Sequence, residues 1–107
     1  MNDGLLNLKY SDVKTLRFLL KSYYKLESAV EKGNANAIAI KADIDYMLNE
    51  NNNITKKDNI EAIKKVYLED LAQTEVADIF GVAQETISYR ITQGIKQIAE
   101  YWEVLDV

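Results

Sequence analysis

The sequence predicts an all-α protein of about five helices. Three observations support this fold class. The 107 residues include no proline and only four glycines, so few positions interrupt a helix. Apolar residues, which make up 48% of the chain, recur at spacings of three and four rather than two. Short polar stretches separate these periodic segments. A chain of this length is expected to form one domain with a real core.

The first predicted helix covers residues 11–32, with Ser11 as its cap and Gly33 at its end. One face of this helix is apolar: Val13, Leu16, Leu20, Tyr23 and Tyr24, widened by Leu19, Leu26 and Val30. The opposite flank forms a basic ridge, which consists of Lys14, Arg17, Lys21 and Lys25. This ridge is either a solvated face or a surface that contacts phosphate or a protein partner.

The second predicted helix follows the turn at Gly33 and Asn34, in the stretch NANAIAIKADIDYMLNE. Its aspartates, Asp43 and Asp45, are two residues apart and therefore point in different directions, which does not suggest a metal site. The polar run NENNN at residues 49–53 predicts a hinge. We therefore expect an N-terminal helical hairpin, residues 1–50, and a C-terminal region, residues 51–107, within one compact unit.

Three more helices are predicted in the C-terminal region. The first runs from residue 55 to about 69, where Thr55 and Asp58 have the spacing of an acidic capping box. The other two cover residues 74–80 and 84 to about 102. The last helix has a continuous apolar stripe that consists of Ile87, Ile91, Ile95, Ile98 and Trp102.

The last two predicted helices and the turn between them indicate a helix-turn-helix motif. The expected fold class is therefore a small helical domain with this motif at its C-terminal end. Gly81 between them can adopt the positive φ that a tight turn requires. The residues expected to hold the two helices together are Val76, Ala77, Ile79, Val82 and Ile87. The second helix would then present polar residues outward, where they can enter a DNA major groove about 12 Å wide.

The stretch LAQTEVADIFGVAQETISYRITQGIKQI, residues 71–98, resembles the C-terminal, promoter-reading domain of bacterial sigma factors and the small sigma-like regulators of Gram-positive phages and prophages. With the preceding helix, the resemblance covers roughly residues 57–102. Ala72 and Ala83 stand where relatives commonly have a Ser or Thr cap. The matching positions, in order, are Leu71, Glu75, Val76, Ala77, Ile79, Phe80, Gly81, Val82, Gln84, Glu85, Thr86 and Ile87.

The resemblance implies a sequence-specific, DNA-binding transcription regulator encoded by a phage or prophage, with double-stranded DNA and RNA polymerase as partners. Carried over by position, it implies that Gln84, Glu85, Ser88 and Tyr89 contact base edges and nearby phosphates. The chemistry agrees, because Gln can pair with adenine, Glu can accept from cytosine, and Thr86 offers a methyl or hydroxyl group. Arg90, Gln93 and Lys96 lie further along the helix and would meet the DNA backbone.

The composition argues against several other classes of protein. The chain has no cysteine and no histidine, which excludes disulfides and thiolate zinc sites and removes the commonest general base. We therefore expect that the protein is not an enzyme and binds no cofactor. The N-terminus MNDGLLNLKY lacks a basic segment followed by an apolar run, and no stretch approaches the roughly 20 apolar residues of a membrane span. We expect a cytoplasmic protein.

The charge distribution keeps other functions open. The net charge is −4, and residues 66–107 hold eight acids and two bases, a balance of −6, whereas residues 9–32 hold six bases and three acids, a balance of +3. An acidic helix-turn-helix is unfavourable for phosphate. One alternative is an interaction module that docks on RNA polymerase or another regulator. Another is a small terminase-like packaging subunit, although residues 103–107 are too few for an oligomerisation segment. The tyrosines on or beside the apolar stripes are expected to form either the edges of the core or a homodimer surface: Tyr10, Tyr23, Tyr24, Tyr46 and Tyr67.

Overall fold

The computed structural model describes residues 8–105, and every regular element in that part of the chain is helical. A 3₁₀ turn, η2, covers Glu50–Asn52, and a π-helical segment, η3, covers Lys64–Leu68. The all-α fold class is confirmed, with one more helix than expected. The α-helices are α1 Val13–Lys21, α2 Tyr23–Glu31, α3 Ala35–Met47, α4 Lys57–Ile63, α5 Gln73–Phe80 and α6 Gln84–Leu105.

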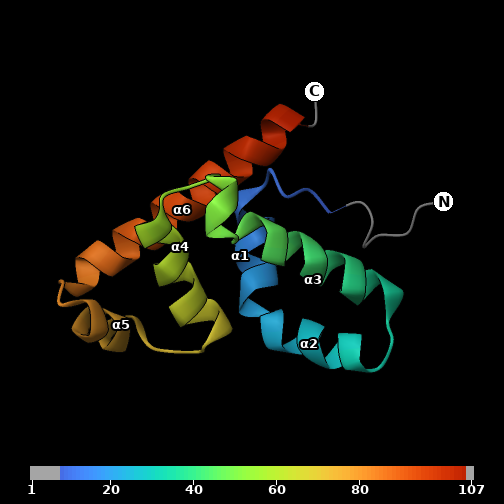
Figure 1. The fold of residues 1–107 in the computed structure, drawn as a ribbon, viewed down its shortest axis with the longest axis horizontal. Coiled ribbons are helices and arrows are strands. Elements are labelled where there is room, and N and C mark those ends of the chain that lie inside the picture. Colours follow the sequence, from blue (N-terminus) through green and yellow to red (C-terminus); the bar gives the residue numbers. More distant parts are fainter. Residues whose placement is uncertain (1–7, 106–107) are drawn as a thin grey trace.

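The additional helix arises because the predicted helix over residues 11–32 is broken at Ser22. The two parts, α1 and α2, run in different directions (Figure 1). The Ser22 N–H is shared between the carbonyls of Phe18 and Leu19, at 3.0 and 3.2 Å. The apolar stripe continues across the break except at Tyr24, which is exposed, and α1 packs against α6 whereas α2 packs against α3. The break therefore lets one stripe cover two different partners.

Local capping differs from the prediction at the start of α1 and of α4. Asp12, rather than Ser11, caps α1, because its Oδ1 accepts from the Lys14 N–H at 3.0 Å. The predicted capping box of Thr55 and Asp58 is wrong, since Lys56 is the N-cap of α4 and makes no side-chain cap. The Thr55 hydroxyl is instead buried and donates to Oε1 of Gln97 on α6.

The helical hairpin expected in the N-terminal half consists of α2 and α3, which lie side by side (Figure 1). Gly33, with φ +81°, makes the turn between them, and the Asn34 side chain accepts from the Ala37 N–H at 2.9 Å to cap α3. The helix predicted after this turn is confirmed. The residues that α3 buries are Ala37, Ile40, Ile44 and Met47.

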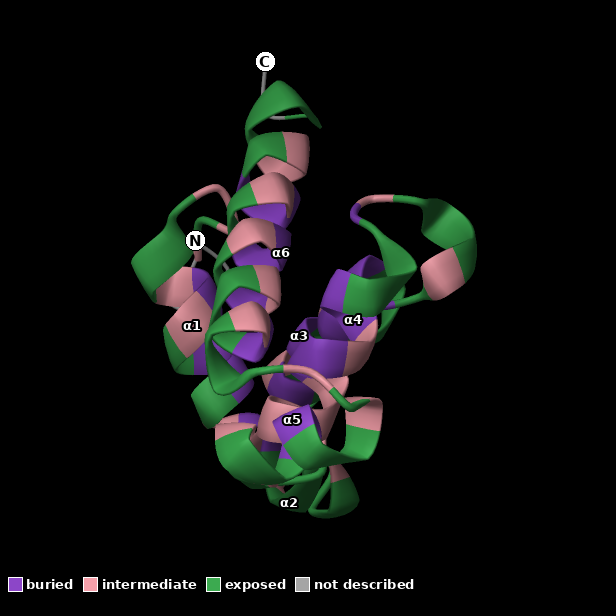
Figure 2. Ribbon diagram, turned by 90° about the vertical axis from the view of Figure 1, so that its left-hand side faces the viewer, coloured by how far each residue is buried: buried purple, intermediate pink, exposed green. Residues whose placement is uncertain are grey.

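One hydrophobic core joins the two halves of the chain. It contains Leu16 and Leu20 from α1, Met47 from α3 and Ile63 from α4. The predicted stripe of α6 is buried from Ile87 to Ile98, while Trp102 packs at the edge of the core. Figure 2 shows these buried surfaces of α3, α4 and α6 facing one another. In this core, α1 and α4 pack directly against α6.

Within the described residues, no helix combines the length and apolarity that crossing a bilayer requires.

Candidate functional site

The helices α5 and α6 are joined by a turn of three residues, 81–83. Gly81 adopts a left-handed conformation with φ +68°, and the Val82 N–H donates to the Ala77 carbonyl at 3.0 Å. Buried Val76 and Ala77 pack α5 onto the core that Ile87 shares. The chain thus has the helix, turn and helix that the sequence predicts at its C-terminal end.

One predicted contact in this unit is wrong. Ile79 was expected to hold the two helices together, but 56% of its surface is exposed. The buried residues of α5 are Val76 and Ala77, and Ile79 lies three residues after Val76, at the outer side of this short helix. Val82 in the turn and Phe80 are half-buried and pack against the core. An apolar side chain is consequently left on the surface of α5.

The start of α5 is stabilised without the missing hydroxyl cap. Ala72 is the N-cap and has no side-chain acceptor. The Ala72 N–H instead donates to Oε1 of Glu75 at 2.9 Å, which is one half of a capping box. Glu75 also lies near the positive end of the helix dipole, where a carboxylate is favourable. At α6, the Thr86 N–H donates to the Ala83 carbonyl at 3.0 Å.

Four of the predicted DNA-binding residues come together on the first two turns of α6. Gln84, Glu85, Ser88 and Tyr89 are all exposed, and Tyr89 exposes 64% of its surface. Within residues 8–105, none of these four side chains makes an internal hydrogen bond or ion pair. Thr86 lies between them and is half-buried. Their donors and acceptors are therefore free to meet a ligand.

The other three predicted residues lie apart from this group. Arg90 is half-buried, and its Nη2 lies 3.9 Å from Oδ2 of Asp58, so its guanidinium is directed toward α4. Gln93 is half-buried, whereas Lys96 is exposed. Lys96 follows Tyr89 by seven residues, which places it roughly 10 Å further along the helix axis. Of these three residues, Lys96 is the exposed one, and it lies beyond the first two turns of α6.

The surface at the start of α6 is predominantly acidic. Glu75 and Asp78 on α5 are exposed, as is Glu85 on α6. The nearest base in the sequence, Arg90, is already directed toward Asp58. This end of the molecule therefore offers hydrogen-bonding groups but little positive charge for phosphate.

The basic ridge is not a straight row. Lys14, Lys21 and Lys25 are exposed, but Arg17 is half-buried and its Nη1 donates to the Tyr67 hydroxyl of η3 at 3.2 Å. Lys25 lies on α2, beyond the break at Ser22. The apolar pattern did not identify Phe18, which exposes 66% of its surface between Lys14 and Lys21. A large apolar residue outside the apolar stripe of a helix was the available signal.

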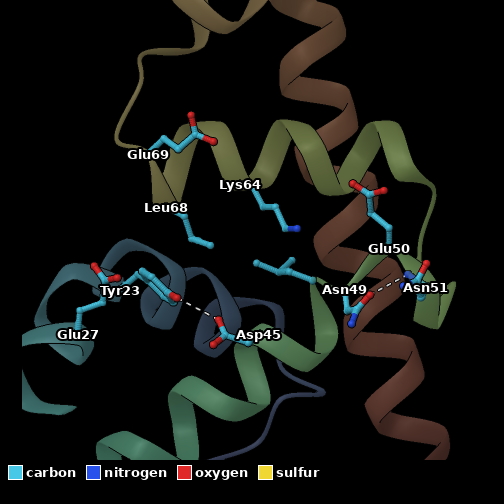
Figure 3. Close-up of a pocket in the computed structure, with 10 residues that line it drawn as sticks. Tyr23, Glu27, Asp45, Asn49, Glu50, Asn51, Lys64, Leu68 and Glu69 are labelled. Carbon is cyan, nitrogen blue, oxygen red and sulfur yellow. Dashed lines mark hydrogen bonds between the residues drawn. The ribbon is translucent and has the colours of Figure 1, made fainter. Parts of the chain in front are cut away.

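A cavity of about 630 Å³ lies between α2, the end of α3 and η3 (Figure 3). Tyr23 and Asp45 meet at one side, where the Tyr23 hydroxyl donates to Oδ1 of Asp45 at 3.0 Å. The Lys64 side chain extends from η3 toward this space. Other carboxylates at its edge have partners, since Glu50 is 3.9 Å from Lys57 and Glu69 is 3.3 Å from Lys65. Most of its acidic groups are therefore already paired within the chain.

Comparisons of the chain with protein-family models, with curated proteins and with solved structures find no match. The assignment of a function therefore depends on the geometry and chemistry described above. The first two turns of α6 can hydrogen-bond a polar ligand, and the surface of α1 and α2 combines lysines with exposed aromatic rings.

Proposed function

We propose that the protein is a sequence-specific, DNA-binding transcription regulator of the sigma-like helix-turn-helix type, encoded by a phage or prophage. In this proposal α6 enters the major groove of double-stranded DNA in the cytoplasm, and RNA polymerase is a partner of the bound complex. The carrying observation is the group of free polar side chains on the first turns of α6, whose opposite face is anchored by buried Ile87 and Ile91. Direct base readout requires such groups on a rigid element.

Each residue has a role in this proposal. Gln84 pairs with adenine through its amide, and Glu85 accepts a hydrogen bond from the amine of cytosine. Ser88 and Tyr89 contact neighbouring bases or phosphates with their hydroxyls. Lys96 contacts the backbone further along the helix. The acidic surroundings reduce affinity for all DNA equally, so discrimination between sequences depends on the base contacts.

The test is a selection from a randomised double-stranded DNA library with the full chain, at two salt concentrations. We expect one enriched motif whose binding weakens as salt rises. The variant Glu85→Ala with Tyr89→Ala should lose the motif but keep its helicity, measured by circular dichroism. Glu100→Ala with Val104→Ala is the matched control, because it removes the same charge from the far end of α6. The absence of a motif, or the same motif in the double variant, would contradict the proposal.

A second candidate function is supported by exposed Ile79. An apolar residue surrounded by carboxylates such as Glu75 and Asp78 is typical of a protein-docking surface rather than of a DNA contact. In this case α5 and α6 bind a basic partner, and the DNA library yields no motif even at low salt. The Ile79→Ser variant separates the two functions, since it should leave DNA selection unchanged if α6 reads bases.

A further inference from the structure

A second surface, on α1 and α2, combines positive charge with exposed aromatic rings, unlike the acidic surface at the start of α6. Phe18 lies four residues after Lys14 and three before Lys21, so the three side chains share one face of α1. Phe18 and Tyr24 each expose 66% of their surface. Beyond the break at Ser22, Tyr24 lines the same cavity as Lys21, and Nζ of Lys25 lies 5.9 Å from the centroid of the Tyr24 ring. We name this the basic–aromatic surface: Lys14, Phe18, Lys21, Tyr24 and Lys25.

The basic–aromatic surface adjoins a cavity of about 370 Å³. Lys21 and Tyr24 form one wall of the cavity, and Tyr67 and Leu68 of η3 form the other. Asp70, which follows η3 with φ +60°, lies at its edge. The π-helical form of η3 and its contact with α1 through Tyr67 and Arg17 hold the second wall in place. The cavity has a suitable size for one large apolar side chain of a partner.

The charge of this surface selects the partner. Lys14, Lys21 and Lys25 are exposed, and within residues 8–105 none of them has a carboxylate within ion-pair distance. Arg17 lies beneath them, half-buried against Tyr67. Cations around an apolar centre with a pocket form the usual arrangement of a docking site, in which the apolar anchor supplies affinity and the charges supply specificity.

We propose that the basic–aromatic surface docks an acidic segment of another protein, which inserts one large apolar side chain into the cavity between α1, α2 and η3. Glutamates or aspartates of that segment pair with Lys14, Lys21 and Lys25, and its apolar side chain packs against Tyr24 and Leu68. Asp70 accepts a hydrogen bond from an N–H of the segment. This docking is independent of α6 and holds whether or not α6 reads DNA.

Two other occupants are distinguished by the experiment. A single-stranded nucleic acid could stack on Phe18 and Tyr24, but stacking on two exposed rings leaves the cavity between Tyr24 and Leu68 without an occupant. A second copy of the chain could offer its acidic α5 surface, and self-association of the protein would reveal that contact.

The experiment selects binders for the immobilised full chain from a displayed library of random 12-residue peptides. We expect enriched peptides with several acidic residues around one aromatic or large aliphatic residue. A fluorescein-labelled peptide of that consensus should lose affinity by at least about tenfold for Phe18→Ser and for Lys21→Glu. Lys32→Glu is the matched control, because it makes the same charge change at an exposed lysine outside the surface and should retain binding. All variants alter exposed side chains, and circular dichroism verifies their fold.

Three results would overturn the proposal. The first is the absence of an acidic consensus, or a consensus peptide that binds Phe18→Ser and Lys21→Glu as tightly as the parent protein. The second is tighter binding of a labelled oligothymidylate, lost in Phe18→Ser, which would assign the surface to single-stranded nucleic acid. The third is concentration-dependent self-association in sedimentation that Phe18→Ser abolishes, which would assign it to a second copy.

Discussion

At the scale of single residues, each of two aspartates of α3 accepts a hydrogen bond from a tyrosine. The Tyr10 hydroxyl donates to Oδ2 of Asp43 at 2.7 Å, and the Tyr23 hydroxyl donates to Oδ1 of Asp45 at 3.0 Å. Asp45 also accepts from the Lys41 ammonium at 2.9 Å. Burial and the neighbouring carboxylate raise the pKa of the Tyr10 hydroxyl far above its ordinary value of 10.0, and the pKa of Tyr23 is raised for the same reasons. These hydrogen bonds connect α3 to α2 and to the segment that precedes α1.

These contacts predict a loss of stability at alkaline pH. An unfolded chain releases the tyrosine proton near pH 10.0, whereas the native state keeps it to a higher pH. Above pH 10, the native state therefore binds more protons than the unfolded state. The stability that this hydrogen bond provides is complete below that pH and falls as the pH rises. The urea midpoint should decrease more steeply between pH 9 and 11 for the parent protein than for Tyr10→Phe. Tyr89→Phe, at an exposed position, should follow the parent, and equal slopes for parent and Tyr10→Phe would contradict this explanation.

Single residues also show where sequence patterns stop being informative. Thr55 has the spacing of a capping residue, yet it is buried between α4 and α6, where it accepts from Nδ2 of Asn59 at 3.0 Å and donates to Gln97. Gln97 is 42 positions away in the sequence. A local pattern could not identify this pair, because the partner is chosen by the packing of α4 on α6. Burying a hydroxyl requires such a partner, which outweighs about 1 kcal/mol from a helix cap.

At the scale of elements, Gly94 sets how closely α4 approaches α6. A Cβ at this position would lie 2.7 Å from Cδ1 of Ile63 and 3.1 Å from Cβ of Asn59. Ile63 can move the end of its side chain, but Asn59 is held by its hydrogen bond to Thr55. This close approach explains the presence of a glycine in the middle of α6, where glycine costs about 1 kcal/mol relative to alanine.

Replacing Gly94 with a large side chain should separate the two helices. We expect Gly94→Leu to lower the free energy of unfolding by about 1–3 kcal/mol, the usual cost of overpacking, despite its better helix propensity. Gly94→Ala should change stability much less, because its Cβ displaces the flexible end of Ile63 and shifts Asn59 by only a few tenths of an ångström, while alanine gains about 1 kcal/mol of helix propensity. Urea unfolding measures both. Thr92→Leu, at an exposed position of the same helix, is the control, and equal stability of Thr92→Leu and Gly94→Leu would refute a close approach.

The helices themselves were largely predictable from local signals, whereas their directions were not. The apolar spacing identified α3, α5 and α6, and Gly33 and Gly81 marked turns that do have positive φ. The break at Ser22 left no such signal, because the apolar stripe is continuous through it. Which part of the stripe meets α6 and which meets α3 is decided by the packing of distant segments. The same reason explains why Arg17 was placed in the basic ridge although it turns toward Tyr67.

At the scale of the whole molecule, the extents are 47 × 34 × 24 Å, with α5 and the start of α6 at one end and the α2–α3 hairpin at the other (Figure 1). The charge follows this division, since four of the six bases of residues 9–32 lie on α1 and α2 and the acids Glu75, Asp78 and Glu85 lie on α5 and α6. The segregation was visible in the sequence. The cavity beside Lys21 was not, because η3 contributes its second wall from more than 40 positions away.

For the affinity of α6 for DNA, the position of a charge should therefore matter more than the net charge of −4. Asp58 lies 3.9 Å from Arg90, and Asp78 is exposed on α5, so Asp58→Asn with Asp78→Asn frees a guanidinium and removes two carboxylates near the first turns of α6. If α6 binds DNA, this variant should bind every sequence more tightly at low salt without changing the preferred motif. One additional phosphate contact steepens the dependence of log affinity on log salt by about 0.9.

The control for this prediction is Glu27→Gln with Glu31→Gln, which changes the net charge by the same amount on α2, at the other end of the molecule (Figure 1). Fluorescence anisotropy of a labelled duplex, at several salt concentrations, measures the affinity and its salt slope for both variants. Long-range repulsion between exposed charges is screened beyond about 10 Å at 0.1 M salt. The α2 variant should therefore bind like the parent protein, and an equal gain in both variants would show that the duplex responds only to the total charge and does not meet α6.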